Sequence, residues 1–314
     1  MGHSARILAA SRSPHGIGFY TFELVIPRII LAELNTHCII SRNSASSRAI
    51  PVEKMLRMVM EDPYIPTHWG KNQKGMQADV EVDEPTAKKA EKAWLYARDL
   101  AAVQAQELLE LGIHKQITNR LLEPFMWHTV VASATELSNL FHLRNNSKAH
   151  PDFIVVANMM QEEHERAEPE DMPYGKWHCP LITPADVLEA CSRSDPKVDA
   201  VAPSKQTLLL NEMVDELLKK VSVARCARVS YLTHEGKRDL QADLGLHDEL
   251  LTNGHMSPFE HVARPMQMDD PAPCRADVRL GTRADISQRW SGKLRGWVPY
   301  RSIIPFESDI LAPR

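Results

Sequence analysis

The segment from Thr36 to Arg48, THCIISRNSASSR, carries the residue types that a phosphate-binding loop uses. Serine hydroxyls and backbone N–H groups bind phosphate oxygens, and the guanidinium of Arg48 can bind two of them at once. A solvated polar loop has the same composition, so that interpretation stays open here. Neither GxGxxG nor GxxxxGK[ST] occurs in the chain, so neither the Rossmann nor the P-loop mode of phosphate binding is indicated.

A second candidate is the run Asn139 to Arg144, NLFHLR, at the end of a helix expected over about 131–143. Asn139 and Arg144 lie five positions apart, about 140° around a helix, so one ligand reaches both only near the helix end. An arginine in this place also stabilises the negative end of the helix dipole without any ligand. Spacing alone therefore favours a structural role.

Two further segments contain histidine beside other reactive side chains. His255 and His261 lie six positions apart with a proline between them, which matches neither HExxH nor a zinc-finger spacing. We therefore expect no metal site. His178 and Cys179 are adjacent, as a base and a thiol nucleophile would be, but a cysteine next to a histidine is usually incidental.

The elements that must position these residues follow from hydrophobic spacing and from proline and glycine. A long polar excursion is expected over 63–83 and a Pro-rich surface linker over 166–205. The expected strands and helices are strands over 6–10 and 18–26, a helix beginning at Pro27, and helices over 52–60, 86–111, 131–143, 149–165 and 206–221.

Composition sets the class of protein. The chain has 314 residues, of which 43% are hydrophobic and 25% charged, and its net charge of −4 argues against a surface for nucleic acid polymers. No apolar run is long enough to cross a membrane, and the beginning of the chain lacks the apolar core of a signal peptide. The five cysteines are scattered and form no CxxC pair. We expect a cytoplasmic enzyme or nucleotide binder that acts away from membranes.

Together these segments resemble the flavin-dependent thymidylate synthase (ThyX) family. The family motif is RHRxxSxNxxSxRY, and residues 36–49 read THCIISRNSASSRA. The motif positions that match are His37, Ser41, Asn43, Ser46 and Arg48, and those that differ are Thr36, Cys38 and Ala49. Residues 134–144, ATELSNLFHLR, are similar to the family's NARxLxNFLxLR helix.

The order of the motifs is unusual for that family. Its ARVSY and GHxSPFEH segments ordinarily come first, whereas ARVSY stands here at 227–231 and GHMSPFEH at 254–261. The chain therefore resembles a circularly permuted member. The resemblance implies an α/β (α+β) fold with a central sheet flanked by helices and a long helical insertion. It also implies a core over 1–165, a linker over 166–205, and a segment over 206–314 that completes the same site.

The resemblance implies specific roles for residues. Arg144 would be catalytic, because it would bond the pyrimidine carbonyl edge and stabilise charge as C5 becomes nucleophilic. Residues implied in substrate binding are Ser46, Arg48, Arg120, Arg144 and Glu33; residues implied in cofactor binding are His37, Ser41, Asn43, Asn139 and His255. The implied cofactors are FAD, methylenetetrahydrofolate and NADPH. The implied assembly is a homotetramer in which Arg120 reaches the nucleotide of a neighbouring subunit.

The departures from the motif bear on the flavin. Thr36 and Cys38 replace two arginines and Ser44 replaces an acidic residue, and each lost charged hydrogen bond costs about 1.5–3 kcal/mol. The arginines that are available to compensate are Arg42, Arg289, Arg295 and Arg301. The first hypothesis is methylation of dUMP to dTMP. The alternatives are 5-hydroxymethylation of dUMP or dCMP, which needs no final hydride, and a nucleotide-binding homologue without catalysis.

Overall fold

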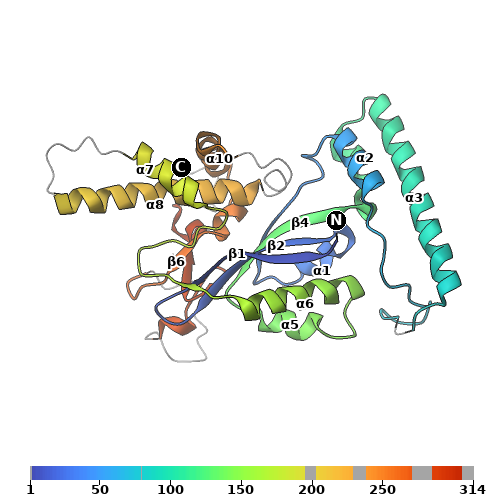
Figure 1. Cartoon of the computed structure of the whole chain (residues 1–314), viewed down its shortest axis with the longest axis horizontal. Helices are drawn as coiled ribbons and strands as arrows, with labels where there is room; N and C mark the ends of the chain where they lie inside the picture. The colour runs from blue at the N-terminus through green and yellow to red at the C-terminus, as the bar shows by residue number, and fades with distance from the viewer. Residues whose placement is uncertain (1, 79, 195–202, 229–237, 271–284, 306–314) are drawn as a thin grey trace.

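A five-stranded sheet forms the centre of the molecule (Figure 1). The computed structural model describes residues 2–78, 80–194, 203–228, 238–270 and 285–305. The strand order is β3-β4-β2-β1-β5, in which β1 and β5 are parallel and the other neighbours antiparallel. The strands are β1 Ser4–Arg12, β2 Gly18–Pro27, β3 Ser41–Ser44, β4 Trp127–Ala134 and β5 Glu170–Asp171. The predicted α/β class and the first two predicted strands are confirmed.

Helices cover both faces of this sheet. The helices are α1 Leu31–Asn35, α2 Val52–Glu61, α3 Glu84–Glu110, α4 Lys115–Thr118, α5 Ser138–Arg144, α6 Pro151–Arg166, α7 Pro184–Arg193, α8 Pro203–Ala227 and α10 Leu240–Thr252. Short strands beyond the sheet are β6 Ala263–Pro265, β7 Trp290–Ser291, β8 Leu294–Arg295 and β9 Trp297–Pro299. Within the described ranges, no helix combines the length and the apolar composition that a bilayer crossing requires.

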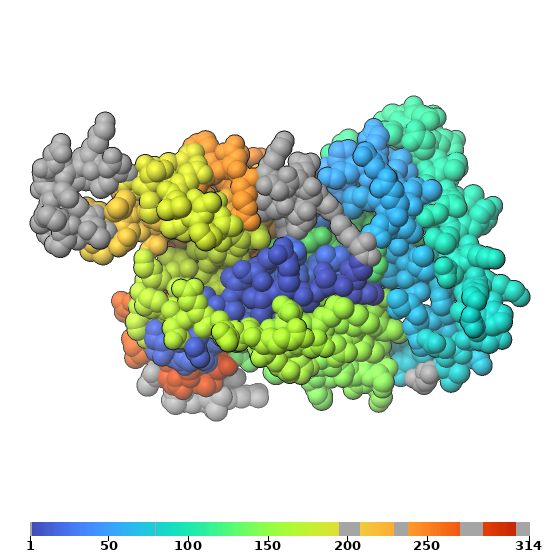
Figure 2. Space-filling view, viewed as in Figure 1, coloured from blue at the N-terminus to red at the C-terminus, as the bar shows by residue number. Residues whose placement is uncertain are grey.

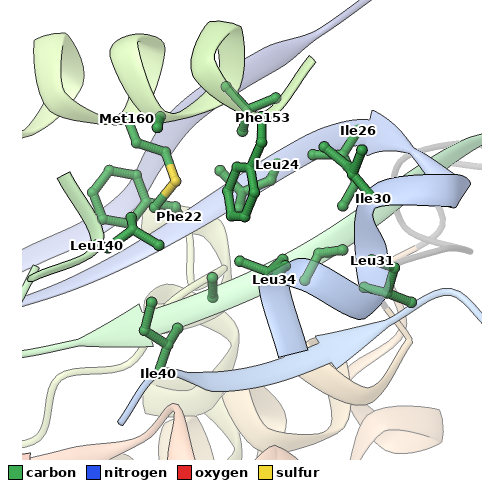
Figure 3. Close-up of a cluster of buried hydrophobic side chains, with 14 of the residues drawn as sticks. Phe22, Leu24, Ile26, Ile30, Leu31, Leu34, Ile40, Leu140, Phe153 and Met160 are labelled. Atoms are coloured by element: carbon green, nitrogen blue, oxygen red, sulfur yellow. The ribbon is translucent and has the colours of Figure 1, made fainter. Parts of the chain in front are cut away.

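The largest apolar core lies between the sheet and the layer formed by α1, α5 and α6 (Figure 3). Alternate residues of β2 point into it, because successive side chains of a strand face opposite sides. Phe22, Leu24 and Ile26 of β2 meet Phe153 and Met160 of α6 there, and all five are at most 1% exposed. Burying one such side chain contributes about 1.5–3 kcal/mol, so this layer holds α5 and α6 firmly in place.

The first half of the helix predicted over 131–143 is wrong. Residues Trp127–Ala134 form the strand β4, and the helix α5 begins only at Ser138. A short apolar run that is buried on both faces has no periodicity that separates strand from helix. The β-branched Thr129, Val130 and Val131 favour the extended state, and pairing with β2 and β3 decides it.

The predicted helix over 86–111 is present as α3, which has 27 residues. Asp83 caps its first turn by accepting a hydrogen bond from the Thr86 N–H at 3.0 Å. Gly112 follows its end with φ +75°, a conformation that glycine adopts without strain. Trp94 of α3 donates from Nε1 to the Tyr64 carbonyl at 2.8 Å, which ties the helix to the body of the protein. Figure 2 shows α2 and α3 forming one end of the molecule, away from α7 and α8.

The segment expected to be a linker over 166–205 contains both β5 and the helix α7. Pro184 stands at the first position of α7, where a missing N–H costs nothing. Thr183, the residue before the helix, and Asp186 in its first turn form a capping box. One proline of this segment therefore begins a helix. Composition alone does not distinguish such a proline from those of a linker.

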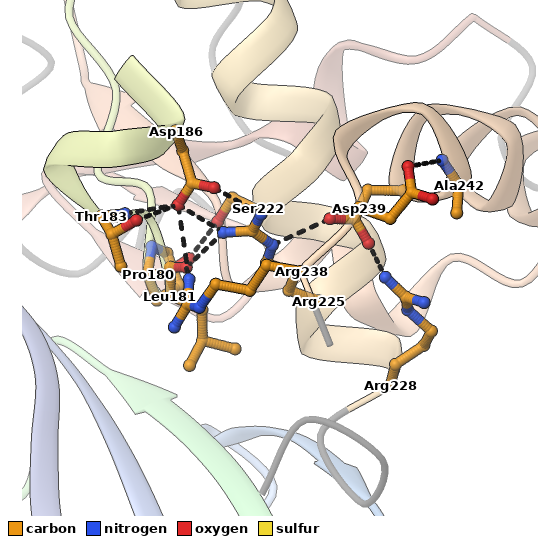
Figure 4. Close-up of polar contacts among 11 residues, drawn as sticks. Pro180, Leu181, Thr183, Asp186, Ser222, Arg225, Arg228, Arg238, Asp239 and Ala242 are labelled. Carbon is orange, nitrogen blue, oxygen red and sulfur yellow. Dashed lines mark hydrogen bonds and ion pairs between the residues drawn. The ribbon is translucent and has the colours of Figure 1, made fainter. Parts of the chain in front are cut away.

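A buried ion cluster joins α7, α8 and α10 (Figure 4). The Arg225 side chain is fully buried and donates to both carboxylate oxygens of Asp186 at 2.6 Å. It also donates from Nε to Asp243 Oδ2 at 2.9 Å and from Nη1 to the Leu181 carbonyl at 2.9 Å. Arg228 pairs with the other oxygen of Asp243. Burial alone would raise the pKa of Asp186, but the hydrogen bonds from Arg225 and Thr183 hold it well below its usual range.

Replacing Arg225 tests this cluster. Arg225→Met keeps most of the length of the side chain but leaves Asp186 and Asp243 as buried charges without their shared partner. Breaking a buried pair in this way costs about 3–5 kcal/mol, so we expect the free energy of unfolding in urea to fall by that amount. Arg193→Met is the control, because Arg193 pairs with Glu189 at the surface and such pairs contribute about 0–1 kcal/mol. Equal losses in the two variants would contradict the structural role of the cluster.

Candidate functional site

The guanidinium of Arg144 is held by three side chains from the segment that follows β2. Its Nη1 donates to Glu33 Oε2 at 2.9 Å, its Nε to His37 Nε2 at 2.9 Å, and its Nη2 to Thr36 Oγ1 at 3.2 Å. Arg144 is the last residue of α5, whereas Glu33 lies on α1. The structure thus brings together Arg144, Glu33 and His37, three of the predicted site residues. Thr36, which replaces a family arginine, is part of the same group.

Packing fixes this group further. The Arg144 guanidinium lies over the Phe153 ring, 4.6 Å from its centroid, and the His37 ring meets the same ring edge-on at 6.0 Å. Burial lowers the pKa of His37, and the positive charges of Arg144 and Arg42 lower it further. His37 is therefore neutral at pH 7 and accepts the Arg144 hydrogen bond at Nε2. The side chain of Arg144 keeps 18% of its surface exposed, so a ligand can still reach it.

Strand β3 divides the neighbouring motif residues between the two faces of the sheet. Ser41, Arg42 and Asn43 pair with Ser133, Ala132 and Val131 of β4, and alternate residues face opposite sides. Arg42 faces the side of α1 and donates to the carbonyls of His37 at 2.7 Å and Ile40 at 2.9 Å.

Asn43 faces the opposite side, where the C-terminal segment packs. The turn of 3-10 helix at Ser257–Glu260, η4, leads into His261, whose Nε2 lies 3.1 Å from the Asn43 amide. The Nδ1 atom of His261 lies 2.7 Å from Ser133 Oγ on β4. Asn43 and His261 are 218 positions apart in sequence. The structure therefore joins the GHMSPFEH segment to the strand that carries part of the THCIISRNSASSRA segment.

Glu260 lies beside this contact and is itself held by cations. It accepts hydrogen bonds from Lys293 at 2.8 Å and from Arg301 at 2.7 Å. Burial alone would raise the pKa of Glu260, but the hydrogen bond and charge of Lys293, with the charge of Arg301, keep it below its ordinary value. The carboxylate is therefore ionised at pH 7 and anchors the last part of the described chain to η4.

The loop between β3 and α2 carries Ser46 and Arg48, both exposed. Asn119 fixes this loop by donating from Nδ2 to the carbonyls of Ser47 at 2.7 Å and Ile50 at 2.9 Å. Arg120 follows Asn119 but points its Nη1 to Glu123 Oε1 at 2.6 Å. Glu123 Oε1 also accepts a hydrogen bond from the Ser47 hydroxyl at 2.6 Å.

Asn139 and His255, the other residues implied in cofactor binding, are both exposed. Within the described part of the chain, no hydrogen bond joins either side chain to His37, Ser41 or Asn43. The last three residues of the ARVSY segment, 229–231, lie outside the described residues. Among described groups of His, Cys, Asp and Glu side chains, no three are arranged to hold a metal ion.

A cavity of about 630 Å³ lies between β1 and the helices α7 and α8. Cys179 lines it, and burial raises the pKa of its thiol to about 12. The adjacent His178 turns away from the thiol, because its two ring nitrogens lie within hydrogen-bond distance of Ser11 and Thr21. Cys179 is therefore a thiol rather than a thiolate at pH 7 and lacks the activation that a nucleophile needs.

Several buried polar residues that contact His178 or His261 were missed by the sequence analysis. Thr21, Ser133 and Ser11 are each at most 4% exposed and form hydrogen bonds with His178 or His261. The available signal was a hydroxyl residue inside an otherwise apolar strand, as in FYTFELVI and TVVASA.

Comparison with known proteins gives structural neighbours only. No family model matches the chain, and no curated protein matches it in sequence. A crystal structure of the UMP/dUMP methylase PolB from Streptomyces cacaoi is 16% identical, with 52% of this chain and 89% of that chain covered and a TM-score of 0.42. Thymidylate Synthase X (ThyX) from Helicobacter pylori, crystallised with FAD and dUMP, is 20% identical, with 46% and 67% covered and a TM-score of 0.32. At these identities and TM-scores, similarity to a known structure does not indicate activity, so a function must be inferred from the residues of this chain.

Removing Arg144 tests the electrostatics of the Arg144 group. Arg144→Gln removes a positive charge from beside His37, which makes the protonated imidazole less unfavourable. We expect the pKa of His37 to rise, as measured by NMR titration of the histidine ring. Arg120→Gln, which removes an arginine that pairs with Glu123, is the matched control and should leave that titration in place. A His37 titration that is the same in wild type and Arg144→Gln would contradict the contact.

Proposed function

We propose that the chain is a folate-dependent enzyme that transfers a one-carbon unit to C5 of a pyrimidine nucleotide. The first candidate reaction is methylation of dUMP to dTMP, in the manner of the flavin-dependent thymidylate synthases. The observation that carries the proposal is the contact between His261 and Asn43, at 3.1 Å across 218 positions of sequence. Two segments that resemble motifs of one family's active site meet in the fold, as a permuted member of that family requires.

Arg144 supplies the central electrostatic interaction of the proposed reaction. As C5 becomes nucleophilic, before it attacks a one-carbon electrophile, negative charge develops on the pyrimidine carbonyl edge. The guanidinium has five N–H donors, and His37, Glu33 and Thr36 accept three of them. Two donors remain for a carbonyl oxygen, from a side chain whose position is fixed before the substrate arrives. Preorganised donors of this kind make the largest single contribution to the rate enhancement of many enzymes.

Exposed residues of the loop between β3 and α2 suit the nucleotide phosphate. We assign the phosphate to Ser46 and Arg48, because both lie exposed on a loop that Asn119 holds in place. Arg120 belongs to the proposal as a residue that serves a neighbouring subunit. The proposed assembly is accordingly a homotetramer with shared sites.

The flavin part of the site is a poorer fit to the residues present. The pyrophosphate of FAD needs cationic donors, and Thr36 and Cys38 stand where the family has arginines. The four arginines that the sequence offers as replacements all donate hydrogen bonds within the chain. Arg42 donates to backbone carbonyls of residues 35, 37 and 40, and Arg289 to those of residues 268 and 270. Arg295 donates to Glu136, and Arg301 to Glu260. These residues do not fit an FAD pyrophosphate, so no step is assigned to FAD or NADPH. Both cofactors, and the lining roles of His37, Ser41, Asn139 and His255, stay in the proposal through the motif resemblance alone.

The engaged arginines favour a second candidate reaction, 5-hydroxymethylation of dUMP or dCMP. That reaction also takes its carbon from methylenetetrahydrofolate, but it ends with addition of water and needs no hydride from a flavin. The nucleotide residues Arg144, Ser46 and Arg48 serve both reactions equally. The two candidates therefore differ in product and in cofactor, and share a substrate site.

The product of the purified protein decides between the candidates. We expect dUMP or dCMP, incubated with methylenetetrahydrofolate, to gain a one-carbon unit at C5 that mass spectrometry detects. A methyl product that requires FAD and NADPH supports the first candidate, and a product heavier by one oxygen that forms without them supports the second. An unmodified nucleotide under all these conditions would contradict the proposed function.

Arg144→Ala tests the catalytic role. The variant loses the cationic donor at the carbonyl edge where charge develops, so we expect kcat to fall by about 100-fold or more. Arg193→Ala, on α7 outside the Arg144 group, is the control and should keep the wild-type kcat. Wild-type turnover in Arg144→Ala would exclude the proposed role of this arginine.

A further inference from the structure

A continuous line of hydrogen-bonded side chains crosses the central sheet on the face that carries the C-terminal segment. It runs from β1 through β2 and β4 to β3 and includes two histidines from outside the sheet. Its links are Ser11 Oγ to His178 Nδ1 at 2.9 Å, His178 Nε2 to Thr21 Oγ1 at 2.9 Å, Thr21 Oγ1 to Ser133 Oγ at 2.7 Å, Ser133 Oγ to His261 Nδ1 at 2.7 Å, and His261 Nε2 to the Asn43 amide at 3.1 Å. We call these six residues the polar chain.

Both histidines of the polar chain are neutral. His178 is 1% exposed and His261 is 0% exposed. Burial lowers the pKa of His178 to about 3 and that of His261 to about 4. Each imidazole therefore has one nitrogen that donates and one that accepts. Each link then fixes the direction of the next.

The orientation of the Asn43 amide determines which atoms donate and which accept along the polar chain. In the amide orientation assigned from its surroundings, Nδ2 lies 3.1 Å from the Arg42 carbonyl, 3.2 Å from the Ser257 carbonyl and 3.1 Å from His261 Nε2, while Oδ1 lies 3.3 Å from Ser257 Oγ. Only this orientation pairs donors with acceptors, so Nδ2 donates and His261 Nε2 accepts.

The direction then passes along every link. His261 carries its proton on Nδ1 and donates to Ser133, Ser133 donates to Thr21, and Thr21 donates to Nε2 of His178. His178 in turn carries its proton on Nδ1 and donates to Ser11. A hydroxyl has one hydrogen and two lone pairs, so reversing the link between Ser133 and Thr21 would leave the buried Ser133 hydrogen without an acceptor in this line of side chains.

We propose that the polar chain is a positioning device for the candidate site, in which His178, Thr21 and Ser133 hold His261 in the tautomer whose Nε2 accepts from the Asn43 amide. Asn43 shares β3 with Ser41, and the motif resemblance implies both in cofactor binding, so the orientation of Asn43 bears on how a cofactor is held. This inference rests on the proposed function for its catalytic consequence. The assignment of each proton to one atom of the polar chain rests only on the geometry of those six side chains.

The tautomers of the two histidines test the order of the protons without any assay of activity. We expect ¹⁵N NMR of the histidine-labelled full chain at pH 7 to show His178 and His261 both protonated on Nδ1. Neutral histidine in water prefers the proton on Nε2, so two Nδ1 tautomers are a specific outcome. A proton on Nε2 of either ring would overturn the proposed order.

A pair of threonine variants tests the positioning role. Thr21→Val keeps the shape of the side chain and removes the hydroxyl, whereas Thr21→Ser keeps the hydroxyl. Thr129→Val is the control, because Thr129 is a buried threonine of β4 outside the polar chain. We expect only Thr21→Val to change the side-chain amide signals of Asn43 and to speed their hydrogen exchange. Unchanged Asn43 signals in Thr21→Val would overturn the positioning role, whatever the activity.

The kinetic readout separates this inference from the proposed function. We expect Thr21→Val to raise the KM for methylenetetrahydrofolate by about ten-fold, the effect of one lost hydrogen bond. The KM for the nucleotide should stay within about two-fold, because Arg144, Ser46 and Arg48 are untouched, and Thr21→Ser should restore both values. A wild-type chain without activity would contradict the proposed function, while the NMR signals of His178, His261 and Asn43 would still decide the positioning role.

Discussion

The pairing of β3 with β4 is the constraint on which the arrangement of the site depends. Because Ser41 pairs with Ser133, alternation along the strand sends Arg42 to one face of the sheet and Ser41 and Asn43 to the other. Arg42 can then bind the carbonyls of the loop that presents His37 to Arg144. Asn43 can meet His261 on the opposite side. A shift of one residue in this pairing would exchange the faces and break both sets of contacts.

Each face then has its own support. On one face, the apolar core around Phe22 and Phe153 fixes α5 and α6, and so places Arg144 beside α1. On the other face, the ion cluster of Arg225, Asp186 and Asp243 joins α7, α8 and α10, and η4 packs against both α8 and β3. The polar chain lies beneath this second layer and satisfies hydroxyls that would otherwise be buried without partners. The site thus lies at an edge strand whose two faces are held by different kinds of interaction.

Sequence patterns predicted the elements whose signals are local. The strand at 6–10 is a short apolar run and the strand at 18–26 alternates. The helix α3 has a capping residue and a closing glycine, and α6 begins with proline after a polar residue. The strand β4 was missed because an apolar run buried on both faces has no periodicity. The helix α7 was missed because its prolines are also typical of a linker. In both cases tertiary contacts decide what the local pattern leaves open.

For the site, the motifs identified Arg144, Glu33 and His37, which the structure brings into one hydrogen-bonded group. They did not reveal that Thr36 belongs to that group, or that the Arg42 guanidinium donates its hydrogen bonds to backbone carbonyls. Nor did they reveal Thr21 and Ser133, because a single hydroxyl in a strand acquires meaning only from what lies across the sheet. Contacts between distant segments depend on strand register, which no single motif contains.

The central claim is that the two separated motifs form one site for nucleotide and cofactor. Hydrogen–deuterium exchange of the full chain with and without dUMP and methylenetetrahydrofolate together tests it directly, because bound ligands slow exchange of the amides that they cover. The account predicts that the two ligands together slow exchange both in residues 36–48 and in residues 254–261. Slower exchange in only one of these segments, or in neither, would contradict it.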